Sequence, residues 1–353
     1  MKAAIKATMK SNRITCSIVG ARGYSGIELA RILLQHPSAE LKYCFATSEF
    51  RLSDYLNSTA ATKVICLTDD QLQAHLTDVV FLATPAEVSL KLAPVIVAAG
   101  KKVIDLSGAF RLKENSYPQW YGFAHTEEAL LKKAQYGLLP WAGPAQKNEL
   151  VANPGCFATA VAMALIPLLK EKVLSAENIV IDAKSGATGA GKKATEKLLF
   201  AEVDGECLPY KVGSHQHYPE IVEAIAAFTG ISLDAHFTTS LLPIRRGIIA
   251  GIYGRLAAGK TIADIEGALF KAYRDYPLVS FAAIGKNSNL LLLKRVIGTG
   301  KTHISFEVQG DKVFVFSCID NLMKGAASQA VENFNRISDL PMGTGIDGLE
   351  AMI

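Results

Sequence analysis

The residues from Ile14 to Pro37 constrain the fold more than any other part of the chain. They combine a strand-like run "ITCSIVG", a glycine turn "GARGYSG" and a helix-like run "IELARILLQH" that ends at the proline. The strand runs "LKYCFAT" and "DVVFLATP", the helix-like "AEVSLKLAPVIVAAG" and the strand run "KKVIDLSG" follow. Alternating strands and helices of this length predict βαβ units, so this half is expected to be an α/β domain that binds ligands at the carboxyl ends of a parallel sheet.

The pattern changes after Cys156, where longer strands with hairpin-like turns predict a second, largely antiparallel sheet. These strand runs are "NIVIDAKSGATG", "DAHFTTSLLPIRRGIIAGIYGRL", "THISFEVQG" and "KVFVFSCID". A final helix is expected in "NLMKGAASQAVENFNRI", because Leu322, Ala326, Ala330 and Phe334 recur at helical spacing. A chain of 353 residues also exceeds the usual size of one core, so two domains are expected.

Charge and cysteine content exclude several classes of protein. The net charge of +4 comes from 37 basic and 33 acidic residues without a basic cluster, so no nucleic-acid partner is expected. The apolar run 158–169 is shorter than the roughly 18 residues of a membrane span, so no membrane partner is expected either. Six separated cysteines without a CxxC pair predict free thiols in a reducing cytoplasm. The first dozen residues are expected to be a disordered lead-in, with a targeting remnant as the alternative.

The glycine turn is a candidate dinucleotide site. Gly20, Gly23 and Gly26 stand between a strand and a helix, where backbone amides at a helix N-terminus bind pyrophosphate. The alternative is a tight turn that needs glycine only for its backbone angles. The candidate cofactor-binding residues of this turn are Gly20, Arg22, Gly23, Tyr24, Ser25 and Gly26.

The end of the next strand, "FATSEFR", bears on the choice of cofactor. Thr47 and Ser48 are hydroxyl residues and Arg51 is a nearby cation, a combination that suits the 2′-phosphate of NADP. Glu49 keeps NAD open as the alternative, because an acidic residue here would bind a ribose 2′-hydroxyl.

Cys156 stands at the predicted start of a helix, behind the strand-breaking "NPG". The helix N-terminus is expected to favour the thiolate and to lower the pKa of this thiol. The alternative is that Cys156 is simply a buried apolar side chain, an interpretation that suits the cysteines within predicted strands better. Those are Cys16, Cys44, Cys66 and Cys318.

An activated cysteine needs a proton carrier, and "SHQHYPEI" places His215 and His217 on a loop that enters a helix. A metal site would need a third ligand, and none stands at suitable spacing, so no metal is expected. A solvated surface loop remains the alternative. Thiol, histidine and dinucleotide turn together indicate an acyl-enzyme and hydride transfer. Candidate groups for an anionic substrate are Arg111, Lys184, Ser185, Arg245 and Arg246.

These motifs resemble the N-acetyl-γ-glutamyl-phosphate reductase family, a relative of aspartate-semialdehyde dehydrogenase. The resemblance runs from about Ile14 to Asn335 through "GARGYSGIEL", "DLSGAFRL", "YGLLP", "NPGCFATA", "AKSGATGAGK", "HQHYPEI", "LLPIRRGI" and "DNLMKGAASQA". It implies a glyceraldehyde-3-phosphate-dehydrogenase-like fold with an NADP-binding Rossmann domain (14–155 and 320–353) and an inserted α+β catalytic and dimerisation domain (156–319). Residues 1–13 would precede both, and the chain would form a homodimer or homotetramer.

The resemblance also implies residue roles. Cys156 would be the nucleophile and His217 the acid and base, and Asn321 would face the nicotinamide. The substrate pocket would be lined by Arg111, Ser185, His215 and Glu220. At Gln216 the chain differs from the family, which usually has arginine there.

The implied reaction is the NADPH-dependent reduction of the acyl phosphate to N-acetylglutamate γ-semialdehyde, in arginine biosynthesis. One alternative is the same chemistry on an N-acetyl-aminoadipyl phosphate or a carrier-bound acyl phosphate, since one methylene changes binding by only about 1 to 3 kcal/mol. Another is a non-catalytic NADP-binding redox sensor in which Cys156 is oxidised.

Overall fold

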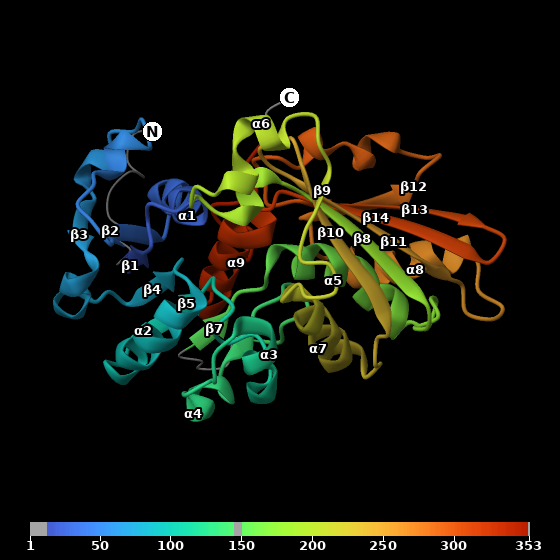
Figure 1. The fold of residues 1–353 in the computed structure, drawn as a ribbon, viewed down its shortest axis with the longest axis horizontal. Coiled ribbons are helices and arrows are strands. Elements are labelled where there is room, and N and C mark those ends of the chain that lie inside the picture. Colours follow the sequence, from blue (N-terminus) through green and yellow to red (C-terminus); the bar gives the residue numbers. More distant parts are fainter. Residues whose placement is uncertain (1–12, 145–149, 352–353) are drawn as a thin grey trace, which may run out of the picture.

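In the computed structural model, which describes residues 13–144 and 150–351, the first part of the chain forms a seven-stranded parallel sheet (Figure 1). The predicted lead-in, apart from Arg13, lies outside the described residues. The spatial order of the strands is β3 (Ile65–Thr68), β2 (Ala39–Ala46), β1 (Ile14–Val19), β4 (Val79–Leu82), β5 (Lys102–Asp105), β7 (Leu150–Ala152) and β6 (Gln135–Tyr136). The order in which strands are added to the sheet reverses at β1, which pairs with both β2 and β4. In open α/β sheets such a reversal leaves a crevice for ligands at the strand ends.

Helices cover both faces of this sheet because its strands carry apolar side chains on both sides. Ile18, Phe81 and Ile104 face α1 (Tyr24–Gln35), whose buried side chains recur at helical spacing. Val80 and Leu82 face the opposite side, where α2 (Ala86–Ala98) packs. The short helices α3 (Tyr117–Tyr121) and α4 (Glu128–Leu131) follow β5. The α/β fold predicted for this half is confirmed.

The second sheet is mixed, with mainly antiparallel neighbours, as predicted. Its strands lie in the order β12 (Val279–Ala283), β13 (Thr302–Gln309), β14 (Lys312–Ile319), β11 (Ile248–Arg255), β8 (Ile179–Gly186), β10 (Ala235–Leu242) and β9 (Leu208–Pro209). Only the pairs β12–β13 and β8–β10 are parallel. The apolar helix α5 (Cys156–Lys170) is buried against this sheet, and α7 (His217–Thr229) and α8 (Ile262–Tyr273) pack on α5. The short α6 (Phe200–Val203) lies at the top of the view in Figure 1.

The last helix, α9 (Ser328–Ile337), lies in the middle of the molecule and packs on α1 and β5 of the first sheet (Figure 1). A π-helical turn, Met323–Ala327, precedes it, a detail that the helix prediction for this segment did not include. Although α9 is buried, it carries polar side chains, and each needs a partner. Lys324 contacts both oxygens of Glu332 at 2.9 and 3.0 Å, and Asn333 donates to the backbone oxygen of Gly137 at 2.9 Å. These contacts hold the π-helical turn in place, and this turn forms part of the site described below.

In the part of the chain that the structure describes, no helix is both long and apolar enough to cross a membrane.

Candidate active site

A cavity of about 500 Å³ opens where the crevice of the first sheet meets the second sheet. Its walls come from the turn before α1, the loop after β5, the start of α5, the loop after β8, the loop before α7 and the π-helical turn. Several residues singled out from the sequence lie together on these walls, namely Gly23, Tyr24, Ser25, Gly26, Arg111, Cys156, His215, His217 and Asn321.

The glycine turn can hold a pyrophosphate. Gly20 has a positive φ of 81°, and a Cβ atom there would lie 2.4 Å from the backbone oxygen of Ala83; at Gly26 it would lie 2.5 Å from that of Gly20. Gly23 has no comparably close neighbour, and it begins α1 without a side-chain cap. The first amides of α1 therefore point into the cavity beside a residue with no side chain, an arrangement that suits a phosphate.

The residues predicted to bind the 2′-phosphate lie at the end of β2, outside the cavity walls. Thr47 and Ser48 are exposed, and Arg22 donates to the Ser48 hydroxyl and, at 3.4 Å, to the Tyr55 hydroxyl. The side chain of Arg51 is 81% exposed and lies 3.5 Å from a carboxylate oxygen of Asp54. Hydroxyls and cations thus stand together on an open surface next to the glycine turn.

Cys156 is the first residue of α5, as predicted, and two glycines enclose it. A Cβ atom on Gly325 would lie 2.7 Å from Cβ of Cys156, so the π-helical turn packs directly on the cysteine. Burial raises the pKa of the Cys156 thiol to about 11, although the positive charge of Arg111 acts to lower it. The expected lowering of this pKa is therefore wrong for the protein without ligand, because burial around the partly exposed Cys156 outweighs the charge of Arg111.

His217 begins α7 and faces the same glycine loop. A Cβ atom on Gly155 would lie 2.4 Å from Nε2 of His217 and 2.8 Å from a guanidinium nitrogen of Arg111, so only glycine fits there. Burial, followed by the charges of Arg111 and Lys211, holds the pKa of His217 well below its ordinary value. A neutral imidazole next to a neutral thiol can accept its proton.

His217 has one ring nitrogen, Nδ1, that is buried without a hydrogen-bond partner among the described residues. Nδ1 of the neighbouring His215 accepts from the backbone amide of His217 at 3.1 Å, and burial lowers the pKa of His215 to about 2. Both histidines are therefore neutral. Across residues 13–144 and 150–351, no group of three or more histidine, cysteine, aspartate or glutamate side chains is arranged to hold a metal ion.

Arg111 and Glu220 form a buried ion pair, with a nitrogen-to-oxygen distance of 3.5 Å and side chains that are 6% and 0% exposed. Glu220 also accepts from the backbone amide of Gly155 at 2.7 Å and from the hydroxyl of Tyr136 at 2.8 Å. Arg111 donates to the backbone oxygens of Asn153 and Leu106 at 2.8 and 2.6 Å. Glu220 thus lies behind the cavity wall, where it holds the loop that precedes Cys156.

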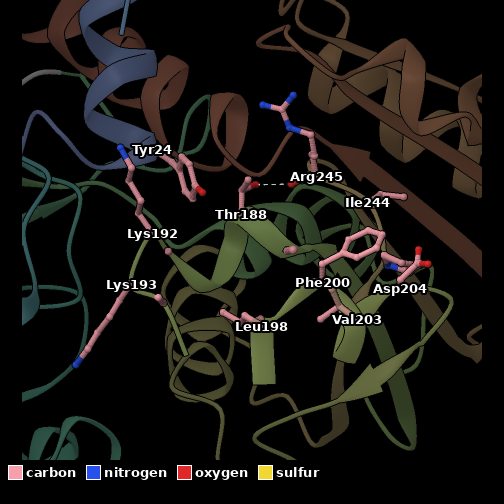
Figure 2. A pocket seen from close by; sticks show the side chains of 14 residues that line it. Tyr24, Thr188, Lys192, Lys193, Leu198, Phe200, Val203, Asp204, Ile244 and Arg245 are labelled. Atoms are coloured by element: carbon pink, nitrogen blue, oxygen red, sulfur yellow. Dashed lines mark hydrogen bonds between the residues drawn. The ribbon is translucent and has the colours of Figure 1, made fainter. Parts of the chain in front are cut away.

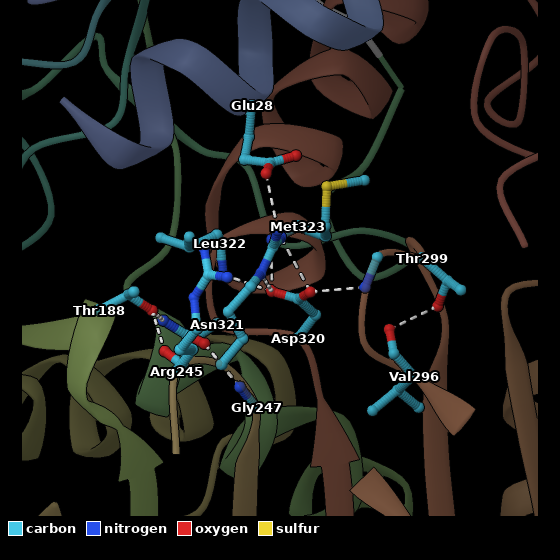
Figure 3. Close-up of polar contacts among 12 residues, drawn as sticks. Glu28, Thr188, Arg245, Gly247, Val296, Thr299, Asp320, Asn321, Leu322 and Met323 are labelled. Carbon is cyan, nitrogen blue, oxygen red and sulfur yellow. Dashed lines mark hydrogen bonds and ion pairs between the residues drawn. The ribbon is translucent and has the colours of Figure 1, made fainter. Parts of the chain in front are cut away.

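Asn321 lies on the cavity wall and is held on both sides (Figure 3). Its side chain donates to Oγ1 of Thr188 at 3.0 Å and accepts from the amide of Gly247 at 2.8 Å. Ser185 is fully buried, and a Cβ atom on Gly189 would lie 2.7 Å from its hydroxyl oxygen. Ser185 therefore lies behind Gly189, not at the surface of the cavity.

Two other cations that were candidates for binding the substrate, Arg246 and Lys184, form ion pairs with carboxylates of the protein. Arg246 pairs with Glu28 of α1 at 2.6 Å and with Asp320 at 2.9 Å, two carboxylates that are labelled in Figure 3. Lys184 pairs with Asp182 on the face of the second sheet away from α5. Neither lines the cavity with Cys156. Arg246 links α1 to the residue after β14, whereas Lys184 pairs within β8.

A second cavity of about 460 Å³ adjoins the first and shares Tyr24, Thr188 and Lys192 with it (Figure 2). Arg245 and Phe200 lie on its other side, and Phe200 is 77% exposed. The aromatic and aliphatic side chains of this cavity form an apolar surface beside the glycine turn; they include Tyr24, Leu198, Phe200, Val203 and Ile244.

Sequence reasoning missed several residues of the site. Tyr136 and Gly325 stand in two of the motifs quoted above, but nothing there gave them a role, and Lys211 stands in none of the motifs. Only the folded chain brings these residues to Glu220, Cys156 and the cavity, respectively. A partial signal existed for Gly325, because a glycine inside a helical pattern usually has a packing reason.

Comparisons with known proteins agree with this geometry. The model of the semialdehyde dehydrogenase NAD binding domain matches residues 15–149, and that of the semialdehyde dehydrogenase dimerisation domain matches 156–321. Among solved structures, aspartate semialdehyde dehydrogenase II of Vibrio cholerae, complexed with ASA, matches with a TM-score of 0.70 at 15% identity, over 93% of this chain and 98% of that one. The enzyme of Francisella tularensis matches with a TM-score of 0.68 at 15% identity, over 92% and 100%. The predicted fold class is confirmed.

Closer relatives narrow the family. N-acetyl-gamma-glutamyl-phosphate reductase of Streptococcus thermophilus is 41% identical over 90% of this chain and 94% of its own length. Its counterpart from Geobacillus thermodenitrificans is 40% identical over the same shares. Identity at this level over nearly the whole chain confirms the resemblance found in the motifs, and the chain belongs to the N-acetyl-γ-glutamyl-phosphate reductase family.

Proposed function

We propose that this chain reduces N-acetyl-γ-glutamyl phosphate to N-acetylglutamate γ-semialdehyde and phosphate with NADPH, in arginine biosynthesis. The observation that carries the proposal is the cavity itself. One continuous wall brings together a thiol at a helix start, a neutral imidazole and a glycine turn suited to a dinucleotide. The names of the relatives supply the substrate.

Cys156 is the proposed nucleophile and His217 the proposed base. As the sulfur attacks the acyl carbon, His217 takes the thiol proton, the carbon–oxygen bond to phosphate breaks and a thioester forms. The amides in the first turn of α5 face the developing oxyanion, where they stabilise its charge. Bound NADPH supplies the hydride that reduces the thioester. His217 gives its proton to the resulting oxygen, and it takes the proton back and returns it to sulfur as the carbon–sulfur bond breaks.

NADP is the proposed cofactor, held at its pyrophosphate by Gly23, Tyr24, Ser25 and Gly26. Support for the phosphorylated form comes from the exposed hydroxyls of Thr47 and Ser48, with Arg22 and Arg51 beside them. Lys192 adds a third cation, because its ammonium group lies 3.3 Å from the backbone oxygen of Arg22. An open surface with several cations suits a 2′-phosphate better than a neutral 2′-hydroxyl.

We also propose the domain division 14–155 with 320–353 and 156–319, and self-association through the second domain as a homodimer or homotetramer. The matched dimerisation domain supports self-association. So does the uncovered face of the second sheet, where Tyr253 contacts Phe314 and Phe316 and Val180 is exposed. Free cysteines suit a cytoplasmic protein.

The test is the phosphate-dependent oxidation of N-acetylglutamate γ-semialdehyde, followed as NADPH formation. Cys156→Ser should abolish this activity, whereas the control Cys207→Ser, at an exposed cysteine, should retain it. His217→Asn should lower turnover sharply while NADP still binds. Unchanged activity in Cys156→Ser would exclude the mechanism. Binding of NADP without turnover in the wild type would instead favour the redox sensor, and faster turnover of the aminoadipate semialdehyde would favour the longer substrate.

A further inference from the structure

Lys211 lies on the wall of the cavity, in the loop between β9 and α7, and neither the motifs nor the mechanism above uses it. Its ammonium group donates to the side-chain oxygen of Gln216 at 2.6 Å. Gln216 lines the same cavity and stands directly before His217. A cation and an amide thus lie side by side next to the proposed base.

The loop holds Lys211 in one place. Tyr210 donates its amide to the backbone oxygen of Thr239 on β10 at 3.0 Å, and the Thr239 hydroxyl donates back at 2.7 Å. The amide of Ser214 closes a turn on the oxygen of Lys211 at 3.0 Å. Lys211 itself has a φ of 47°, in the left-handed region that disfavours a residue with a Cβ atom. Such strain is often found where a side chain must be positioned for function.

Lys211 differs from the other cations on the cavity wall in the partners that its charge has. Arg111 is paired with Glu220 and also donates to two backbone oxygens. Lys192 lies at the cofactor end, over the ring of Tyr55 at 4.5 Å. Among the described residues, Lys211 has no carboxylate within ion-pair distance, and its partner Gln216 is neutral. Lys211 is exposed on the cavity wall, and a cation without a counter-ion at this position is suited to receive an anion from the substrate.

We propose that Lys211, with Gln216 beside it, binds the carboxylate at the far end of the acyl-phosphate substrate. This inference rests on the proposed function, whose substrate carries two anions. The phosphate must leave from the carbon attached to Cys156, where Arg111 lies against Gly155, the residue before Cys156. Lys211 instead faces the two imidazoles, on the side of His215 and His217. The carboxylate therefore binds at a cation that is separate from the wall beside the leaving phosphate.

The test pairs a variant with a substrate lacking the charge. Wild-type protein and Lys211→Met are assayed with N-acetylglutamate γ-semialdehyde and with its α-carboxamide. We expect the wild type to prefer the carboxylate by about 10- to 100-fold in kcat/KM, as for one hydrogen bond to a charged group. Lys211→Met should lose this preference and Lys211→Arg should restore part of it. Lys192→Met serves as the matched control and should raise the KM for NADP while keeping the preference.

Each outcome decides between explanations. A preference that survives in Lys211→Met, in protein whose circular dichroism matches the wild type, overturns the inference. A rise in the KM for inorganic phosphate, with the carboxylate preference intact, would assign Lys211 to the leaving group and also overturn it. If wild-type protein turns over neither semialdehyde, the proposed function fails first and the inference fails with it.

Discussion

Replacing Glu220 by glutamine removes a charge from the centre of the protein without changing the shape of the side chain. Glu220 is fully buried and pairs with Arg111, and it accepts from the amide of Gly155 and the hydroxyl of Tyr136. The glutamine keeps one carbonyl oxygen for these donors. It leaves the guanidinium of Arg111 without a counter-ion in a place that water reaches poorly.

The expected loss follows from these contacts. Breaking a buried ion pair by removing one partner costs about 3–5 kcal/mol. Arg111 keeps its hydrogen bonds to the backbone oxygens of Asn153 and Leu106, so we expect Glu220→Gln to lower the free energy of unfolding by about 3 kcal/mol. The negative charge of Glu220 also raises the pKa of the Cys156 thiol, so the variant should lower that pKa from about 11.

Urea unfolding measures the first effect, and the rate of iodoacetamide labelling against pH measures the second. Glu223→Gln is the matched control on the same helix. Glu223 accepts from the amide of Lys113 at 2.8 Å and the hydroxyl of Ser116 at 3.1 Å, without a buried cation, and should cost about 1 kcal/mol. If the two variants unfold alike, the ion pair does not stabilise the loop before Cys156. If labelling of Cys156 in Glu220→Gln slows, the sign of the electrostatic effect is wrong.

Two further predictions concern other parts of the molecule. Gly325→Ala places a Cβ atom about 2.7 Å from that of Cys156. Because a displacement of about 1 Å at a reacting group can lower the rate about 100-fold, kcat should fall steeply. Gly267→Ala, at an exposed helix position with open space around it, should instead raise the free energy of unfolding by about 1 kcal/mol. Burial lowers the pKa of His303 to about 4, so the unfolded chain takes up a proton first as the pH falls below about 6.5. Stability should therefore decline between about pH 6.5 and pH 4, and His303→Gln should flatten that decline; an unchanged slope in urea unfolding across this range would rule out His303 as a cause.

The fold could be predicted well from the sequence because its main elements carry regular patterns. The run from Ile14 to Gln35 has a strand, a turn and a helix, each with its own period, and the structure contains all three. The packing of α9 was harder to predict, because the burial of Glu332 and Asn333 depends on their partners Lys324 and Gly137. No local sequence pattern reveals these partners. The π-helical turn was missed for the same reason.

The site could be predicted in its parts, though the pKa of its thiol could not. Local rules placed Cys156 at a helix start and His217 at a helix entrance, and the structure has both there. The expected lowering of the thiol pKa considered only the helix, whereas burial depends on what the rest of the chain packs over the sulfur. Lys211 was missed because a lone lysine is usually solvated, and only the folded loop turns it toward the cavity.

The position of α9 also affects how the protein is made. Its Phe334 packs on Phe81 of β4 at 6.1 Å between ring centroids, and on His36 after α1 at 5.3 Å. A ribosome that has synthesised all seven strands of the first sheet has not yet released α9, which covers this face together with α1. Although domains generally fold in the order of synthesis, the nascent chain keeps the α9-facing side of Phe81 uncovered until Ser328–Ile337 emerges. The sheet that is translated first is therefore completed only after the second sheet has been translated.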